Sequence, residues 1–287
     1  MMRLVLRCLL SGAVLLGVVG VTGGCGEESE ALPLKGTVGL LTYNVAGLPD
    51  YISGSNPEVN MVQISALLNP YDLVLVQEDF SYHQDLMGDL DHPYQTEPAA
   101  LRTRLMHDGL NRFSRYPFRD HQREQWVACF GGTSSGSGDC LAEKGFSVAI
   151  TEFAEGIDVH VYNLHVEAGG GEKDHRAREE GVLQLINFVQ TYSAGEAVLI
   201  AGDFNLHGSD PIEGPLLTRL IEELELGDSC TFLKCGTELI DRVLFRSSEG
   251  VELTPLTWEI PDHFVDAKGG PLSDHDPVHV EISWTRR

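Results

Sequence analysis

The chain is poor in basic residues. Its 287 residues include 20 Lys and Arg against 43 Asp and Glu, and the formal net charge at pH 7 is −23. Beyond the N-terminal segment, no run of basic side chains is longer than a pair. Nucleic-acid binders gain much of their affinity by neutralising phosphates with Lys and Arg. This composition therefore disfavours polymeric DNA as a partner, although a metal ion and a local basic patch would suffice for an acidic nuclease.

Internal repeats are absent, and no linker divides residues 37–287, so we expect one large α/β domain there. Four cysteines lie in this part of the chain, in two close pairs without the spacing that a zinc site requires. In an exported protein an even set of four predicts two local disulfides, Cys129–Cys140 and Cys230–Cys235. Other pairings and reduced thiols are the alternatives.

No apolar segment is long enough to predict a membrane span with confidence. The longest, Leu9–Val21, follows Arg3 and Arg7, and this order of charge and apolar residues is typical of a signal peptide. We therefore predict a signal peptide over residues 1–25 and an exported protein.

The end of this segment, Thr22-Gly23-Gly24-Cys25, resembles a bacterial lipoprotein cleavage site. Cys25 would then carry the lipid, with residues 26–36 as a flexible tether and residues 37–287 as the domain. Because Thr22 stands where Leu is usual, ordinary secretion is the alternative. The expected location is the outer membrane or cell surface, or the medium.

The most informative segment is Ala201-Gly202-Asp203-Phe204-Asn205, which follows a strand-like apolar run. Asp203 and Asn205 are two residues apart and so point the same way from the strand end. A carboxylate that holds water and an amide that holds an anionic oxygen suit metal-assisted attack on phosphate. Asp and Asn also close turns after strands, so the segment needs support from elsewhere.

Polar side chains adjoin strand-like segments at five further places. They are Asn44, Glu78, His165, Asp241 and the pair Asp274-His275. Carboxylates are hard oxygen ligands for magnesium, manganese or calcium, and histidines beside carboxylates exchange protons near neutral pH. Polar groups gathered at one edge of a sheet form an active site rather than a core.

One long helix is expected to start near His175 and to run to about Tyr192. Its apolar residues have helical spacing and should cover a sheet; they are Val182, Leu185, Ile186 and Val189. The histidines other than His165 and His275 are interpreted as surface or core-edge residues.

In their order along the chain, these segments resemble the endonuclease/exonuclease/phosphatase superfamily from about residue 38 to 284. The resemblance rests on Leu41-Thr42-Tyr43-Asn44-Val45, Val74-Leu75-Val76-Gln77-Glu78, Ser114-Arg115-Tyr116-Pro117, Asn163-Leu164-His165, Gly202-Asp203-Phe204-Asn205, Ile240-Asp241-Arg242-Val243 and Ser273-Asp274-His275. It implies a four-layer α/β sandwich, with two facing mixed β-sheets flanked by helices. It also implies a monomeric, metal-dependent phosphoric ester hydrolase.

The resemblance assigns metal binding to three residues. Glu78 is the expected direct ligand of a divalent ion, with Asn44 and Asp274 beside it. The expected ion is Mg²⁺, with Mn²⁺ or Ca²⁺ as alternatives.

The resemblance assigns the chemistry to five more residues. Asp203 and Asn205 would handle water and phosphate. His275, oriented by Asp241, would act as general base or phosphate contact. His165 would stabilise the transition state or assist the leaving group.

Two segments resemble lipid-hydrolysing branches of the superfamily. In Asp139–Phe146, a Lys-Gly element matches sphingomyelinase-type and inositol-phosphatase-type sequences and implies that Lys144 lies near the phosphate. The alternative for Lys144 is a solvated turn residue. Trp258–His275 resembles secreted sphingomyelinase-like sequences. A phospholipid such as sphingomyelin is therefore favoured over nucleic acid, with a deoxyribonuclease-like endonuclease and a non-catalytic binding lipoprotein as alternatives.

Overall fold

The computed structural model describes residues 32–50, 53, 56–102, 104–132 and 138–287. The predicted signal peptide, Cys25 and most of the tether lie outside these residues. The chain has two compact units, and Pro33–Arg287 is the one described below. Within the described residues, no helix has both the length and the apolar character needed to cross a bilayer.

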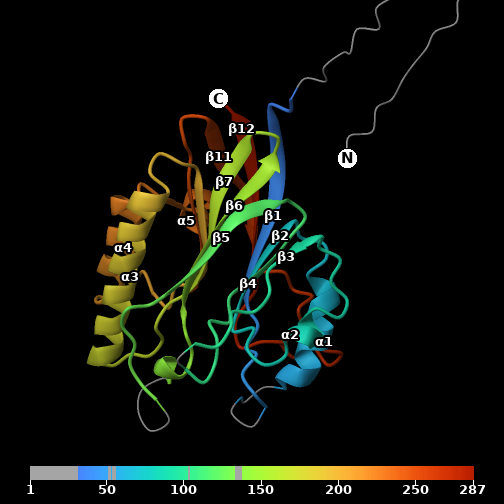
Figure 1. Cartoon of the computed structure of the whole chain (residues 1–287), viewed down its shortest axis with the longest axis vertical. Helices are drawn as coiled ribbons and strands as arrows, with labels where there is room; N and C mark the ends of the chain where they lie inside the picture. Colours follow the sequence, from blue (N-terminus) through green and yellow to red (C-terminus); the bar gives the residue numbers. More distant parts are fainter. Residues whose placement is uncertain (1–31, 51–52, 54–55, 103, 133–137) are drawn as a thin grey trace, which may run out of the picture. The chain divides into compact units, whose positions relative to one another are not determined.

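This unit contains both strands and helices (Figure 1). In chain order they are β1 (Lys35–Asn44), α1 (Pro57–Leu67), β2 (Leu73–Gln77), α2 (His83–Leu86), β3 (Tyr94–Gln95), β4 (Asn111–Ser114), β5 (Phe118–Gln125), the 3₁₀ helix η1 (Asp139–Leu141), β6 (Gly145–Ala154), β7 (Ile157–His165), α3 (Glu172–Tyr192), β8 (Val198–Asp203), α4 (Glu213–Glu223), β9 (Gly227–Asp228), α5 (Ser229–Leu233), β10 (Asp241–Arg246), β11 (Val251–Glu259) and β12 (Val278–Arg286).

The strands of the described residues form two six-stranded mixed sheets. One has the order β11-β12-β1-β2-β4-β3, and the other has the order β5-β6-β7-β8-β10-β9. Each sheet has one parallel pair at its centre, β1 with β2 and β7 with β8. Antiparallel strands flank both pairs, β12 beside β1 and β10 beside β8.

Three apolar clusters fill the interfaces between four layers, which are helices, sheet, sheet and helices. This layering confirms the predicted four-layer α/β sandwich. The cluster between the sheets includes Leu40, Leu75, Val161 and Leu199. A second cluster packs α3 and α4 on the sheet that contains β7, and a third packs α1 on the sheet that contains β1. Alternate residues of β2 and β8 face opposite clusters, which is why these two strands are apolar until their last residues.

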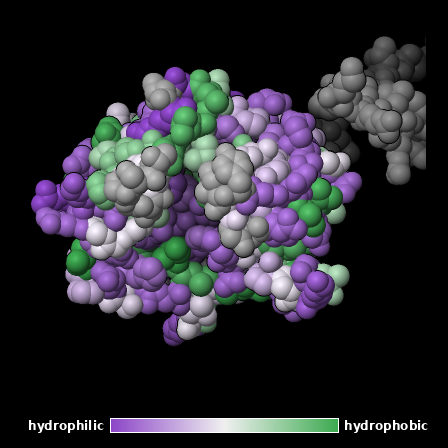
Figure 2. Space-filling model, turned by 90° about the horizontal axis from the view of Figure 1, so that it is seen from below, coloured by the Kyte–Doolittle hydropathy of each residue, from purple (hydrophilic) through white to green (hydrophobic). Residues whose placement is uncertain are grey.

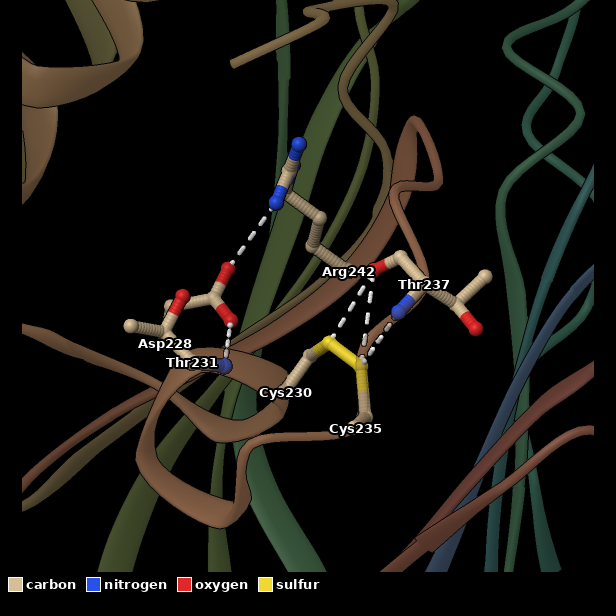
Figure 3. Close-up of a disulfide and its surroundings, with 6 residues drawn as sticks. All are labelled: Asp228, Cys230, Thr231, Cys235, Thr237 and Arg242. Atoms are coloured by element: carbon tan, nitrogen blue, oxygen red, sulfur yellow. Dashed lines mark hydrogen bonds and ion pairs between the residues drawn. A yellow bond between two sulfur atoms is a disulfide. The ribbon is translucent and has the colours of Figure 1, made fainter. Parts of the chain in front are cut away.

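Helix α3 matches the predicted one, and its four predicted apolar residues are buried against the β7 sheet. Both predicted disulfides are present, Cys129–Cys140 and Cys230–Cys235. The second lies just before β10, close to the ion pair between Asp228 and Arg242 (Figure 3).

Candidate active site

The predicted site residues lie at one edge of the two sheets. The parallel strands β1 and β2 end at Asn44 and Gln77, and β7 and β8 end at His165 and Asp203. Antiparallel β10 begins at Asp241, directly opposite Asp203. This edge is the lower end of Figure 1, and Figure 2, which views that end, shows a hydrophilic hollow near its centre. The strand order thus gathers residues that are far apart in sequence.

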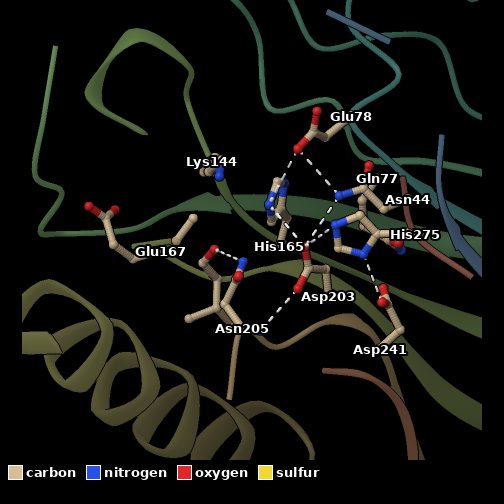
Figure 4. Close-up of polar contacts among 12 residues, drawn as sticks. Asn44, Gln77, Glu78, Lys144, His165, Glu167, Asp203, Asn205, Asp241 and His275 are labelled. Carbon is tan, nitrogen blue, oxygen red and sulfur yellow. Dashed lines mark hydrogen bonds and ion pairs between the residues drawn. The ribbon is translucent and has the colours of Figure 1, made fainter. Parts of the chain in front are cut away.

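Asp203 is at the centre of the polar contacts (Figure 4). Its Oδ2 is 3.2 Å from Asn44 Nδ2 and 3.3 Å from His165 Nε2. The same oxygen is 3.7 Å from His275 Nε2. Asp203 Oδ1 accepts a hydrogen bond from the Asn205 backbone N–H at 3.0 Å. The structure therefore brings four of the predicted residues around one carboxylate.

Gly202 explains how β8 brings Asp203 so close to β7. A Cβ atom at this position would lie 2.1 Å from the Leu164 carbonyl oxygen, and φ of Gly202 is +142°. Only glycine allows both the close approach and this backbone conformation. The register that follows pairs His165 with Asp203.

Asn44 joins the two sheets at this edge through its amide. Its Nδ2 donates to Glu78 Oε1 at 3.3 Å as well as to Asp203. Its Oδ1 accepts from the Ala46 N–H at 3.1 Å, so the amide oxygen faces away from the carboxylates. Direct metal binding by Asn44 would require this amide to rotate, and the role stays a prediction.

Asp274, the third predicted metal ligand, is exposed. Its Oδ1 is 3.4 Å from the Ser273 hydroxyl, which also donates to the Asn44 carbonyl oxygen at 2.7 Å. Ser273 therefore ties the Asp274-His275 loop to the end of β1. Metal binding by Asp274 is an expectation that no contact in this arrangement tests.

The carboxylates at this edge fit a divalent cation. Burial of Asp203, together with the charge of Asp241, raises its pKa to about 7, although the charges of His275 and Lys144 oppose the shift. A buried anionic centre with too little positive charge around it is stabilised by a hard cation. Glu78 Oε1, which shares Asn44 Nδ2 with Asp203, supplies a second carboxylate oxygen. Asp203, Asp241 and His275 also offer ligand atoms within 4.8 Å of one another, but the last two bond to each other.

His275 and Asp241 form a close pair, with His275 Nδ1 2.8 Å from Asp241 Oδ2. Burial of the ring lowers the pKa of His275. The hydrogen bond to Asp241 and the charges of Asp241, Asp203 and Asp274 outweigh burial and raise it to about 9. Nδ1 is held by Asp241, so Nε2, which faces Asp203 Oδ2, is the nitrogen that can exchange a proton.

This pair predicts a pH-dependent stability in metal-free protein. The folded pKa of His275 is about 9, above the ordinary value of 6.5. The protonated ring therefore stabilises the fold fully below about pH 6.5, and the contribution is lost as pH rises through about 9. The difference in unfolding free energy between wild type and His275→Gln, measured by urea titration in EDTA, should shrink over that range. A difference that is constant from acid to alkaline pH would contradict the assignment.

His165 is buried and stays neutral. Burial lowers its pKa well below the usual value, and the charges of Lys144 and His275 act in the same direction. Its backbone carbonyl accepts a hydrogen bond from Trp126 Nε1 at 2.7 Å, which fixes the end of β7. A neutral imidazole here can donate from Nε2 to an anionic oxygen without adding charge.

Lys144 is 9 % exposed and pairs with Asp139, so the alternative of a solvated turn residue is wrong. Its charge lowers the pKa of both His165 and Asp203. Contact with a substrate phosphate stays a prediction.

Sequence reasoning assigned no role to Asp139 or Glu167. Asp139 Oδ2 accepts from the Ala168 N–H at 3.2 Å, and Glu167 Oε1 accepts from the Phe130 N–H. Burial and the charge of Asp139 raise the pKa of Glu167 to about 7. Asp139 begins η1 next to Cys140, and Glu167 lies in the loop between β7 and α3. Neither residue belongs to a local sequence pattern that would have identified it.

Residues 41–275 match the Endonuclease/Exonuclease/phosphatase family. The chain belongs to this family. The residues that the sequence resemblance assigns to catalysis and metal binding lie at the edge described above, and these roles stay predictions. The predicted family and fold are both confirmed.

A curated relative, a sphingomyelinase from Mycobacterium bovis, is 34% identical over an alignment 280 residues long that covers 88% of this chain and 54% of the relative. The chain thus spans about half the length of this relative. Among solved structures, sphingomyelinase C from Streptomyces griseocarneus gives a TM-score of 0.64 at 18% identity, over 86% of this chain and 99% of that one. A mutant of beta toxin from Staphylococcus aureus with bound magnesium ions gives 0.63 at 18% identity, over 85% and 99%. The two structures support the fold.

Proposed function

We propose that this protein is an exported, divalent-metal-dependent phosphodiesterase whose favoured substrate is a phospholipid such as sphingomyelin. One observation carries the proposal. Asp203 Oδ2 lies within 3.7 Å of Asn44 Nδ2, His165 Nε2 and His275 Nε2. A carboxylate, two histidines and an amide around one point supply the proton exchange and the oxyanion contacts that phosphoester hydrolysis requires.

Water attacks phosphorus in line with the leaving oxygen. The His275 ring is neutral when it accepts the proton of this water at Nε2, because a divalent ion bound at this edge would offset the carboxylate charges that raise the pKa of His275 to about 9 in metal-free protein. Asp241 holds the ring by Nδ1 and stabilises the charge that forms. Asp203 orients the water. A bound Mg²⁺, held by Glu78 with Asn44 and Asp274 beside it, would neutralise charge on the phosphoryl oxygens. The neutral His165 ring and Asn205 donate to those oxygens as the bond between phosphorus and the leaving oxygen breaks. The leaving alkoxide takes a proton from solvent water, and His275 later returns its proton to solvent.

Two features support a lipid substrate. The 34% identical relative is named a sphingomyelinase. In this chain Leu105 and Val127 are both 72% exposed, and both adjoin the segment that carries Lys144. The Leu105 N–H donates to the Leu141 carbonyl, and Trp126, next to Val127, donates from its N–H to the Lys144 carbonyl. Exposed aliphatic side chains beside a phosphate site suit contact with lipid chains.

Export through the predicted signal peptide is part of the proposal, with a lipid on Cys25 or free secretion. The two disulfides support it, since such bonds persist in oxidising compartments. Mass spectrometry of the mature protein would find a diacylated Cys25 or a lipid-free N-terminus.

Hydrolysis of sphingomyelin, a phosphoinositide and plasmid DNA by the full chain tests the proposal. Each substrate is combined with Mg²⁺, Mn²⁺, Ca²⁺ and EDTA, and His275→Gln serves as the inactive control. Metal-dependent release of phosphocholine with intact plasmid is the expected result. Plasmid nicking with inert lipids would assign the protein to the nucleases, and no hydrolysis at all would favour a binding role.

Replacing Lys144 by Met should lower kcat/KM for sphingomyelin by about 10–100-fold, because an ammonium close to a phosphate makes a charge-assisted hydrogen bond. Lys173→Met is the matched control, since Lys173 Nζ lies over the Phe130 ring, 5.0 Å from its centroid. Steady-state kinetics on mixed micelles separates kcat from KM. Equal losses in the two variants, or none in Lys144→Met, would remove Lys144 from the phosphate site.

A further inference from the structure

Glu78 has a backbone conformation that few residues with a side chain adopt. Its φ is +57°, in the left-handed region, at the first residue after β2. Such a conformation is strained for a residue with a Cβ atom and persists only where its surroundings impose it. Resting on the proposed role of Glu78 in binding a cation, we propose that Asp79, through His83 and Asn111, is a positioning residue that holds Glu78 in metal-binding geometry.

The peptide group between Glu78 and Asp79 is fixed by two glycine segments. The Glu78 carbonyl oxygen accepts from the Gly47 N–H at 2.9 Å, and the Asp79 N–H donates to the Gly109 carbonyl at 3.1 Å. A Cβ atom on Gly47 would lie 2.5 Å from the Glu78 carbonyl oxygen, and one on Gly109 would lie 3.1 Å from Glu78 Cα. The backbone is thus enclosed, but neither contact determines which way the Glu78 side chain leaves it.

The Asp79 side chain holds this backbone segment, and with it the direction in which the Glu78 side chain leaves the backbone. It is fully buried, and its Oδ2 accepts from His83 Nδ1 at 2.6 Å and from Asn111 Nδ2 at 2.7 Å. His83 begins α2, and Asn111 begins β4 opposite Val76 of β2. A buried carboxylate is costly without such donors. Turning the Glu78–Asp79 segment out of its left-handed conformation would withdraw Asp79 from both of them.

Asn111, one of the two donors to Asp79, is itself held by residues from other segments. Asn111 Oδ1 accepts from Thr96 Oγ1 at 3.1 Å and from Arg123 Nη2 at 2.9 Å, and the Asn111 carbonyl accepts from Asn163 Nδ2 at 3.1 Å. Asn163 in turn accepts from Gln77 Nε2 at 2.7 Å. This cluster therefore fixes the residues on both sides of Glu78, Gln77 and Asp79, without any of its side chains reaching Asp203. Its expected effect is on where the Glu78 carboxylate lies.

Titration of the full chain with Mn²⁺, followed by electron paramagnetic resonance, tests this role without any assay of activity. Outer groups that orient a metal ligand typically contribute 10–100-fold to affinity. Asp79→Ala should therefore weaken Mn²⁺ binding by about 10-fold or more. Asp79→Asn keeps an oxygen that accepts both hydrogen bonds, so it should retain most of the affinity. Asn111→Ala should also weaken binding, and it replaces Asp79→Ala if that variant does not fold.

Ser193→Ala is the matched control for stability. The Ser193 hydroxyl is buried and bonds to His160 Nδ1 at 2.7 Å and to the Tyr162 hydroxyl at 2.6 Å, away from the site edge. It should lower Tm and leave Mn²⁺ affinity unchanged. If Asp79→Ala and Asn111→Ala bind Mn²⁺ within about two-fold of wild type while Glu78→Gln loses binding, the positioning role is wrong. If Glu78→Gln itself binds normally, the proposed metal placement fails, and this inference fails with it.

Discussion

Replacing His275 by Ala is expected to lower kcat for phosphodiester hydrolysis by about 10³-fold, within the range of general acid–base catalysis, while the protein stays folded. His275 Nε2 faces Asp203 Oδ2 at 3.7 Å, and the opposite nitrogen is held by Asp241. Without the ring, no group held in this way removes the proton from the attacking water. Single-turnover hydrolysis of sphingomyelin with Mg²⁺ measures the chemical step, and circular dichroism checks the fold.

Asp241 acts through His275, so the two losses should not add. Asp241→Asn alone should lower kcat, and the double variant should be about as slow as His275→Ala, as is usual for residues that act as a unit. His207→Ala is the control, because His207 Nδ1 also pairs with a carboxylate, Glu213 Oε2, at 3.0 Å. Near-normal kcat in His275→Ala, or fully additive losses, would contradict the assignment.

The sequence could predict the central strands, the long helix α3 and the polar residues at strand ends, because these depend on local periodicity. Apolar runs before Asn44, Glu78 and Asp203 predicted the strands β1, β2 and β8. Because β1 is parallel to β2 and β7 is parallel to β8, the polar residues at the ends of each pair lie at a shared edge. Helical spacing located α3 to within a few residues. The superfamily resemblance supplied the layering, which local pattern alone does not determine.

Contacts between distant segments could not be predicted in the same way. The histidines outside the motifs were interpreted as surface or core-edge residues, yet His83, His92 and His160 are buried and hydrogen-bonded. Their partners depend on which segments the two sheets bring together. Asp139 and Asp79 were unassigned for the same reason, because a lone acid gives no periodic signal.

Residues with a left-handed backbone conformation at the site could not be predicted from the sequence either. Ala46, Glu78 and Asn205 all have positive φ, and all three adjoin strand ends at the site edge. A sequence gives Gly and Asn as candidates for such positions, but not Glu. Local preference fails at Ala46 and Glu78 because long-range contacts hold the backbone, and Glu225 and Lys234 show that such positions also occur away from the site.

Replacing Glu78 by Gln should weaken Mg²⁺ binding and lower kcat by about 10³-fold, because loss of metal charge stabilisation removes several kcal/mol from the transition state. Gln has nearly the same size as Glu and keeps an oxygen for Asn44 Nδ2, which bonds Glu78 Oε1 at 3.3 Å. The substitution thus removes charge more than shape. Isothermal titration with Mg²⁺ and a magnesium dependence of kcat measure the two effects separately.

Glu167→Gln is the matched control for Glu78→Gln. Glu167 is also a buried acid near the site, but burial and the charge of Asp139 raise its pKa to about 7, so a neutral amide resembles a form it already has. Its Mg²⁺ affinity should match wild type. A high magnesium concentration should restore part of the lost rate in Glu78→Gln, since the remaining oxygens still bind the ion weakly. Normal Mg²⁺ affinity and a normal rate in Glu78→Gln would place the metal elsewhere, at Asp203, Asp241 and His275.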